Sequence, residues 1–161
     1  MKVMTNRISI DSYMMNLARL AAARATCPRR AVGAVLVRDG KVISTGYNGS
    51  PPGMAHCFGD SCKNEAGNCI NTIHAETNAI ISAPRMGDTL YCTDKPCASC
   101  LKTALAHNPK IRIVWWRHYP DLDRDQFVAL HGIEKQLEQV TIFLGREMLE
   151  YLPPMPDERQ P

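Results

Sequence analysis

The first clear hydrophobic pattern lies between residues 9 and 25, where apolar side chains recur every three or four positions. This period predicts an amphipathic helix that covers a sheet with one side. Ser9 or Asp11 is expected to cap the helix, because both residue types accept hydrogen bonds from the first backbone N–H groups. We expect the apolar stripe to include Leu17, Leu20 and Ala21.

The next apolar segments are short and β-branched, at residues 34–38 and 42–47, and predict two strands. Asp39-Gly40 between them is a strong signal for a hairpin turn. A stretch rich in Gly, Asn and Cys then runs to about Asn71. Loops of that length are uncommon unless they bind something, so we expect an additional constraint to hold this one in place.

Beyond the loop, helical and strand patterns alternate, which indicates βα units on a common sheet. The expected elements are a helix at 73–83, a strand at 89–93, a helix at 97–107, a strand at 110–116, a short helix at 125–131, a strand at 140–144 and a last helix at 146–151. Residues 153–161 contain four prolines and no apolar period. We therefore expect one domain over residues 1–152, followed by an extended tail.

Composition agrees with one globular domain, since 161 residues can bury one sizeable core and 45% are hydrophobic. The net charge of +3 comes from scattered basic residues, which suits a small anionic substrate better than a nucleic acid. No leader pattern or long apolar run is present, so a cytoplasmic protein is expected. Seven cysteines favour metal ligation and free thiols over disulfides. Cys92, in a predicted strand, is interpreted as a core residue without function.

The most specific chemical pattern joins His74-Ala75-Glu76 to Pro96-Cys97-Ala98-Ser99-Cys100. Cys97 and Cys100 are three positions apart, so on a helix they share a face and can grip one ion. Pro96 suits a helix start, where the helix dipole stabilises thiolates. With His74 as a third ligand, the fourth position of a zinc ion stays open to water, as in catalytic zinc sites.

A Cys-x-x-Cys pair alone is more often a structural zinc site or a redox pair. A His-x-Glu segment ends 21 residues before Cys97. It favours the catalytic interpretation, because few sequences meet the requirement for both motifs in this arrangement. We expect Asn71 or Thr72 to cap the helix that carries His74. The buried side of that helix should contain Ile73, Ala79, Ile80 and Ala83.

Both segments resemble the His-x-Glu…Pro-Cys-x-x-Cys signature of the zinc-dependent cytidine deaminase superfamily. Further blocks are similar to the deoxycytidylate (dCMP) deaminases: Cys27-Pro28-Arg29-Arg30, Val32-Gly33-Ala34-Val35 and Ser44-Thr45-Gly46-Tyr47-Asn48-Gly49-Ser50-Pro51. The likeness spans residues 27–100 and continues more weakly to about Tyr119. It implies an α/β fold with three layers, α/β/α, around a central mixed five-stranded sheet.

The resemblance also implies an activity, the hydrolytic deamination of dCMP to dUMP and ammonia, which feeds thymidylate synthesis. It implies a homo-oligomer, often a hexamer, activated by dCTP and inhibited by dTTP, sometimes with Mg²⁺. Glu76 would move the protons, because a carboxylate beside the attacking water can take and return them. If Glu76 were itself a zinc ligand, the coordination shell would be closed and would leave no position for water. Elsewhere a first-turn Glu is commonly a solvated acid that matches the helix dipole.

The remaining cysteines supply a candidate for the constraint on the long loop. A second, structural zinc ion held by Cys27, Cys57, Cys62 and Cys69 would have a closed shell and contribute to folding. The spacing also allows three thiolates completed by His56, or free cysteines. The resemblance favours four cysteines, because many dCMP deaminases bind a second zinc ion from matching positions.

A nucleotide substrate requires a group that binds phosphate. Arg29 and Arg30 are the best cations for it, since a guanidinium matches phosphate oxygens with paired hydrogen bonds, and the resemblance favours Arg29. Asn48 can hold a sugar hydroxyl or be a plain turn residue, and the resemblance favours substrate contact. It also implies contacts from Ala75 and Tyr119.

Tyr119 is followed by Asp121-Leu122-Asp123-Arg124, where related sequences often continue differently. The rest of the phosphate pocket therefore does not follow from the resemblance. Trp115 and Trp116, just before it, suggest base stacking, but core packing or a subunit contact is the more common role of aromatic residues at strand ends.

Two other functions compete with the nucleotide deaminase. The same chemistry can act on a nucleoside, a base, or a nucleotide in tRNA or single-stranded DNA, but a polynucleotide calls for a basic groove with exposed aromatic residues, and the chain has only 6% aromatic residues. A non-enzymatic zinc module, for interaction or uptake, would not need the proton shuttle that Glu76 supplies.

Overall fold

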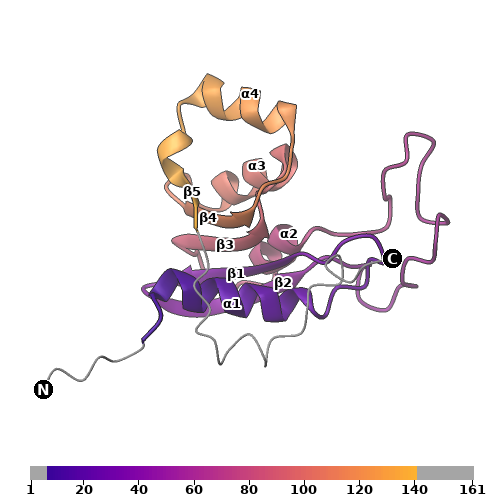
Figure 1. Ribbon diagram of the computed structural model, residues 1–161, viewed down its shortest axis with the longest axis horizontal. Helices are drawn as coiled ribbons and strands as arrows, with labels where there is room; N and C mark the ends of the chain where they lie inside the picture. The colour runs from indigo at the N-terminus through magenta and orange to yellow at the C-terminus, as the bar shows by residue number, and fades with distance from the viewer. Residues whose placement is uncertain (1–6, 141–161) are drawn as a thin grey trace, which may run out of the picture.

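In the computed structural model, which describes residues 7–140, five strands form one mixed sheet in the order β2-β1-β3-β4-β5 (Figure 1). β1 is antiparallel to both neighbours, whereas β3, β4 and β5 are parallel to one another. The strands are β1 (Gly33–Arg38), β2 (Lys41–Tyr47), β3 (Thr89–Asp94), β4 (Arg112–Arg117) and β5 (Leu137–Gln139).

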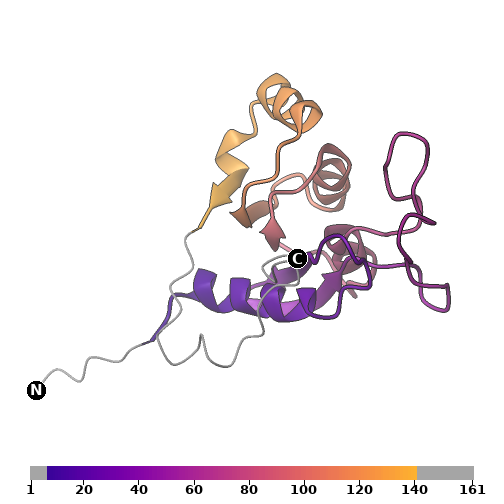
Figure 2. The ribbon, with the colours of Figure 1, turned by 45° about the vertical axis from the view of Figure 1, so that its right-hand side comes forward.

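Helices cover both faces of this sheet, so the expected three-layer α/β/α architecture is confirmed (Figure 2). α1 lies on one face, α2 and α3 lie on the other, and α4 packs outside α3. The helices are α1 (Ile10–Ala22), α2 (Ala75–Ile81), α3 (Ala98–His107) and α4 (Leu122–His131), with a 3₁₀ turn at Glu134–Gln136. No helix in residues 7–140 is long and apolar enough to cross a bilayer.

β1 shows how the strand pattern divides the core. Ala34 and Leu36 point into the cluster formed with α2 and α3, while Val35 and Val37 join the cluster under α1. Adjacent side chains of a strand point to opposite faces, so a strand covered on both sides is apolar throughout.

α1 begins where the sequence predicts, because the Ser9 hydroxyl accepts a hydrogen bond from the Ser12 N–H at 3.1 Å. Its predicted apolar stripe is confirmed in part: Leu17 packs against the cluster under α1, but Leu20 is 52% exposed. The two buried methionines lie on the neighbouring face, which presents more apolar volume to the sheet. The buried apolar residues of this face are Met14, Met15, Ala18 and Ala22.

Two glycines allow the helices to approach the strands closely. A Cβ at Gly33 would lie 1.8 Å from the Ala18 carbonyl oxygen, and a Cβ at Gly46 would lie 2.1 Å from that of Ala75. No side chain fits there without moving a helix. Gly46 therefore holds the first turn of α2, which follows His74, directly against the end of β2.

The hairpin between β1 and β2 is confirmed. Asp39 and Gly40 both have positive φ values, 51° and 72°, as a tight hairpin turn requires. Near the C-terminus the prediction is less accurate. α4 begins at Leu122, three residues before the predicted start, and the strand Leu137–Gln139 was not predicted. Residues 141–161, which include nearly all of the strand predicted at 140–144, the predicted last helix and the tail, lie outside the described residues.

Asp11 connects α1 to the two strands beneath it, β3 and β4, so its charge contributes to stability. Arg112 donates two hydrogen bonds to the Asp11 carboxylate, at 3.1 and 3.2 Å, and Tyr91 donates a third at 2.6 Å. The hydrogen bonds from Arg112 lower the pKa of Asp11. A lowered pKa means that this stabilisation is present above the unfolded carboxyl pKa and is lost as pH falls through the folded one.

We expect Asp11→Asn to lower the free energy of unfolding by about 1 kcal/mol at pH 7, because the charged partner is lost. The difference from the wild-type chain should begin to shrink as pH falls below the unfolded carboxyl pKa of about 3.9 and should disappear as pH falls through the lower pKa of the folded state. Urea unfolding of both proteins at pH 7 and pH 3 measures this. An equal difference at both pH values would show that the charge of Asp11 contributes nothing.

Candidate active site

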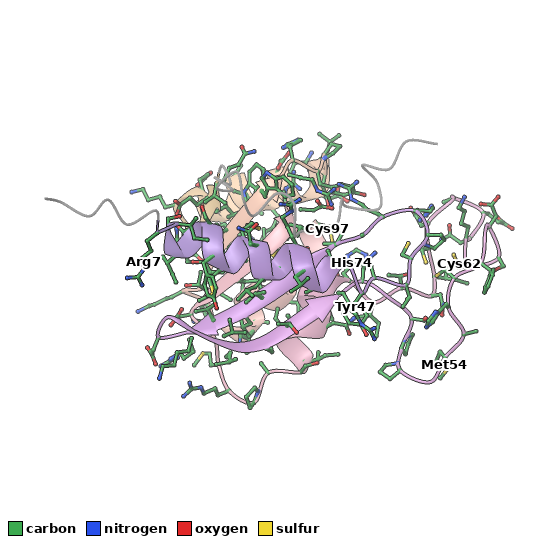
Figure 3. The ribbon with its side chains drawn as sticks, turned by 60° about the horizontal axis from the view of Figure 1, so that its bottom comes forward. Arg7, Tyr47, Met54, Cys62, His74 and Cys97 are labelled. Atoms are coloured by element: carbon green, nitrogen blue, oxygen red, sulfur yellow. The ribbon has the colours of Figure 1, made fainter. Side chains whose placement is uncertain are left out.

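His74, Cys97 and Cys100 meet at one end of the sheet. The Cys97 and Cys100 sulfur atoms lie 3.5 and 3.3 Å from Nδ1 of His74, and the three donor atoms are all within 4.8 Å of one another. Figure 3 shows His74 and Cys97 together near Tyr47, at the end of β2. One imidazole nitrogen and two sulfur atoms are the donors that zinc prefers, so the group can hold a zinc ion.

Two helix starts bring these ligands together. His74 is the N-cap of α2 and Cys97 is the N-cap of α3, so the predicted caps at Asn71 or Thr72 are wrong and Pro96 lies one residue before the cap. The segment before His74 is fixed by a bridge between Ile73 and Gly49, with backbone hydrogen bonds of 2.8 and 3.1 Å.

The protonation states of this candidate ligand group favour the binding of a metal ion. Hydrogen bonds from Cys100 and His74 lower the pKa of Cys97, so this residue is a thiolate at neutral pH. The Cys97 thiolate in turn raises the pKa of both Cys100 and His74. A metal ion that binds here displaces the proton held by the other donors, as expected of a coupled thiol site.

Glu76 lies beside the metal ligands but is not one of them in the structure. Its side chain is 4% exposed, and the Cys100 thiol donates to its Oε2 at 3.6 Å. Burial raises the pKa of Glu76 to about 7. A carboxyl group with such a pKa can both accept and release a proton near neutral pH.

A pocket opens beside Glu76 and is lined by all four of the predicted substrate contacts, namely Arg29, Asn48, Ala75 and Tyr119. Asn48 makes two side-chain hydrogen bonds to the backbone. Its Oδ1 accepts from the Val32 N–H and its Nδ2 donates to the Arg30 carbonyl, both at 2.8 Å. An amide has a second N–H and a second lone pair, so it can still contact a substrate. Arg29 is exposed and donates to the Gly67 carbonyl at 3.0 Å.

Asp94 and Lys95 also line this pocket, and the sequence reasoning missed both. Asp94 is 4% exposed and accepts hydrogen bonds from Arg30 and Arg117, each at 2.6 Å. The Arg30 guanidinium also lies over the Tyr119 ring, 4.7 Å from its centre. The available signal was an acidic residue at the end of a buried strand, two positions before the Pro-Cys-x-x-Cys motif.

The two tryptophans take no part in the pocket. Trp115 is 7% exposed, with Lys95 over its ring, and Trp116 packs beside α1 with Arg19 over its ring. These contacts agree with core packing rather than base stacking.

Cys57, Cys62 and Cys69 form a second group that can hold a metal ion, within the long loop that extends beyond the end of the sheet in Figure 3. Cys57 and Cys69 sulfur atoms are 3.7 Å apart. Neither Cys27 nor His56 belongs to this group. Cys27 instead lines the pocket beside Cys69, so the structure joins three of the four predicted thiols and leaves the fourth nearby.

Comparison with known proteins gives consistent matches. Residues 8–115 match the family described as the cytidine and deoxycytidylate deaminase zinc-binding region. ComE operon protein 2 of Bacillus subtilis is 43% identical over 104 residues, 62% of this chain and 55% of that protein. The deoxycytidylate deaminase of Saccharomyces cerevisiae is 44% identical over 104 residues, 58% of this chain and 33% of that protein.

Among solved structures, the dCMP deaminase of cyanophage S-TIM5, in complex with dCMP and dUMP, superposes with a TM-score of 0.66 at 27% identity. That match covers 81% of this chain and 96% of the phage protein. By contrast, the chain spans between a third and about half of the length of the first curated relatives it matches. The profile match, the shared fold and the ligand group together show that this chain belongs to the cytidine and deoxycytidylate deaminase zinc-binding family.

Proposed function

We propose that this protein catalyses the zinc-dependent hydrolytic deamination of dCMP to dUMP and ammonia. The observation that carries the proposal is a buried Glu76 that lies next to, but outside, the His74, Cys97 and Cys100 group and lines a pocket. A purely structural zinc site has four protein ligands and no need for such a carboxylate. The S-TIM5 relative, solved with dCMP and dUMP, supports the choice of substrate.

His74, Cys97 and Cys100 would hold the zinc ion, which supplies a Lewis acid that makes water nucleophilic near neutral pH. Glu76 takes a proton from the water that attacks C4 of the cytosine ring and delivers a proton to N3. It then takes the remaining proton from the hydroxyl group now bonded to C4 and passes it to the amino group, which leaves as ammonia while the C4 carbonyl forms. The overall balance is dCMP plus water to dUMP plus ammonia, with Glu76 returned to its starting state.

The charges of the pocket favour a nucleotide over a free nucleoside. Arg29, Arg30 and Lys95 line it, against the carboxyl groups of Asp94 and Glu76. We assign the substrate phosphate to Arg29, because its guanidinium is exposed at the pocket and can bind two phosphate oxygens. Tyr119 borders the same side of the pocket, beside Arg30. Asn48 and Ala75 would contact the sugar and base portion.

We also propose that Cys27 joins Cys57, Cys62 and Cys69 around a second, structural zinc ion. Burial raises the pKa of Cys69, but its hydrogen bond with the Thr72 hydroxyl and those with the backbone of Asn71 and Thr72 outweigh burial and lower this pKa to about 6, which favours metal binding by the thiolate. A closed site here would hold the long loop next to the active site.

We expect Cys62→Ser to reduce the zinc content from about two ions per chain to about one, because a closed site does not tolerate the loss of a thiolate. The melting temperature should fall by about 6 °C, for a loss of about 2 kcal/mol. Cys92→Ser is the matched control, since Cys92 is buried in β3 outside both groups. An unchanged zinc count in Cys62→Ser would refute the second site, and Cys27→Ser against His56→Ala would identify the fourth ligand.

Family membership supports two further proposals, a homohexamer and control by nucleotide triphosphates. We propose that dCTP with Mg²⁺ activates the enzyme and that dTTP inhibits it, which would match dUMP production to thymidylate demand. Light scattering of the purified protein, with and without each triphosphate, measures the assembly. Initial rates at low dCMP concentration measure the regulation.

A further inference from the structure

The segment Asp121 to Arg124, where related sequences often differ, contacts two parts of the candidate active site. These are the residues on either side of Cys97 and the backbone of Tyr119. Asp121 is the N-cap of α4, and its Oδ1 accepts a hydrogen bond from the Arg124 N–H at 2.9 Å. Its second oxygen, Oδ2, accepts from the Ala98 N–H at 3.0 Å. Ala98 is the first residue of α3 and directly follows Cys97, so one carboxylate caps α4 and fixes the start of α3.

Arg124 makes the complementary contacts with its guanidinium. Its Nη1 donates to the Pro96 carbonyl at 3.2 Å and to the Tyr119 carbonyl at 2.7 Å. Pro96 directly precedes Cys97, and Tyr119 lines the pocket. The Arg124 side chain therefore joins the zinc-ligand turn to the segment that borders the substrate pocket.

Burying the Arg124 side chain costs free energy, which indicates that its hydrogen bonds have a structural role. The side chain is fully buried, at 0% exposed, and its Nη2 has no hydrogen-bond partner among the described residues. Its carboxylate partner among the described residues is Asp125, which accepts from Nε at 2.9 Å and is itself exposed. Burying a guanidinium with incomplete pairing is costly, so the hydrogen bonds that Arg124 does make are needed to offset that cost.

We propose that Asp121 and Arg124 are positioning residues that hold Cys97 for metal binding and Tyr119 for substrate binding. The hydrogen bonds to Pro96 and Ala98 flank Cys97 on both sides, so they limit the movement of its sulfur atom. Groups that orient metal ligands in this way commonly change metal affinity or activity by about 10-fold to 100-fold when they are removed. Figure 1 shows α4 next to α3, the helix that begins directly after Cys97.

Asp121→Ser separates positioning from helix capping. Serine is an N-cap about as good as aspartate, so it keeps the hydrogen bond from the Arg124 N–H, but it has a single oxygen and loses the bond to the Ala98 N–H. We expect the melting temperature to stay within about 2 °C of wild type. Zinc transfer from the site to a chromogenic chelator should become about tenfold faster. Asp123→Ser, at an exposed position of the same helix turn, is the control and should behave as wild type.

Arg124→Met tests the second half of the proposal. We expect it to raise the Michaelis constant for dCMP about tenfold and to speed zinc release. The matched control is Arg19→Met, another buried arginine, on α1 over the Trp116 ring, which should lower stability without affecting zinc release or the Michaelis constant. Zinc release is measured in the Cys62→Ser background as well, to isolate the His74 site.

The Michaelis constant part of this test rests on the proposed deaminase function, whereas the zinc part does not. Wild-type zinc release in Asp121→Ser would overturn the positioning role, whether or not Arg124→Met folds. Equal rates of zinc release in Arg124→Met and Arg19→Met would show that Arg124, like Arg19, contributes only to stability. Absence of turnover in the wild-type protein would refute the deaminase and leave the zinc result to decide the positioning role.

Discussion

Replacing Glu76 with glutamine should reduce dCMP deamination by about 10³-fold or more while the zinc content stays unchanged. Glutamine has nearly the same shape but cannot accept and return a proton, so the loss should fall on kcat. The environment of Glu76 is prepared for this role, because burial raises its pKa to about 7. Ammonia release at saturating dCMP, with zinc quantified on the same sample, gives both numbers.

Glu134→Gln is the matched control, since Glu134 is exposed on the 3₁₀ turn outside the pocket. Loss of zinc together with activity in Glu76→Gln would show that Glu76 is a metal ligand and not a proton shuttle. Retention of full activity would assign the proton transfer to another group.

Arg29→Ala should raise the Michaelis constant for dCMP tenfold or more and change that for deoxycytidine less than about threefold. A charged hydrogen bond to phosphate is worth about 1.5–3 kcal/mol, and deoxycytidine has no phosphate to lose it. The structure places the Arg29 side chain at the pocket, with one donor on the Gly67 carbonyl. Steady-state kinetics with both substrates measures the ratio.

Arg24→Ala controls for general charge, because Arg24 is also exposed near the end of α1 but does not line the pocket. Arg30→Ala provides a second comparison, since Arg30 contacts Asp94 and the Tyr119 ring. Equal effects of Arg29→Ala on both substrates would remove Arg29 from the phosphate site. A selective effect of Arg30→Ala alone would transfer the phosphate contact to Arg30.

Local sequence patterns predicted the group of candidate zinc ligands and the parts of the fold that position it. The His-x-Glu and Pro-Cys-x-x-Cys segments were expected at two helix starts, and the structure brings the donor atoms of His74, Cys97 and Cys100 within 4.8 Å of one another there. The β1–β2 hairpin followed from Asp39-Gly40, whose backbone needs positive φ at both positions. These features depend on neighbouring residues, so the sequence contains the full signal.

Contacts between distant segments were not predictable in the same way. Asp94 pairs with Arg30, 64 residues away, and Asp121 reaches Ala98, 23 residues away. Such pairs depend on strand order and helix docking, which the local pattern does not encode. β5 was not predicted for a related reason, because Leu137–Gln139 contains a single apolar residue and is a strand through its pairing with β4.

The most direct test of the proposed function is ammonia release by the purified protein from dCMP, deoxycytidine, CMP and a short cytosine-containing single strand, with zinc counted per chain. We predict selective turnover of dCMP by protein that contains about two zinc ions. Turnover only of the nucleoside or the single strand would keep Glu76 and the zinc ligands and contradict the phosphate pocket. Zinc-loaded protein that releases no ammonia from any of the four would contradict the deaminase itself.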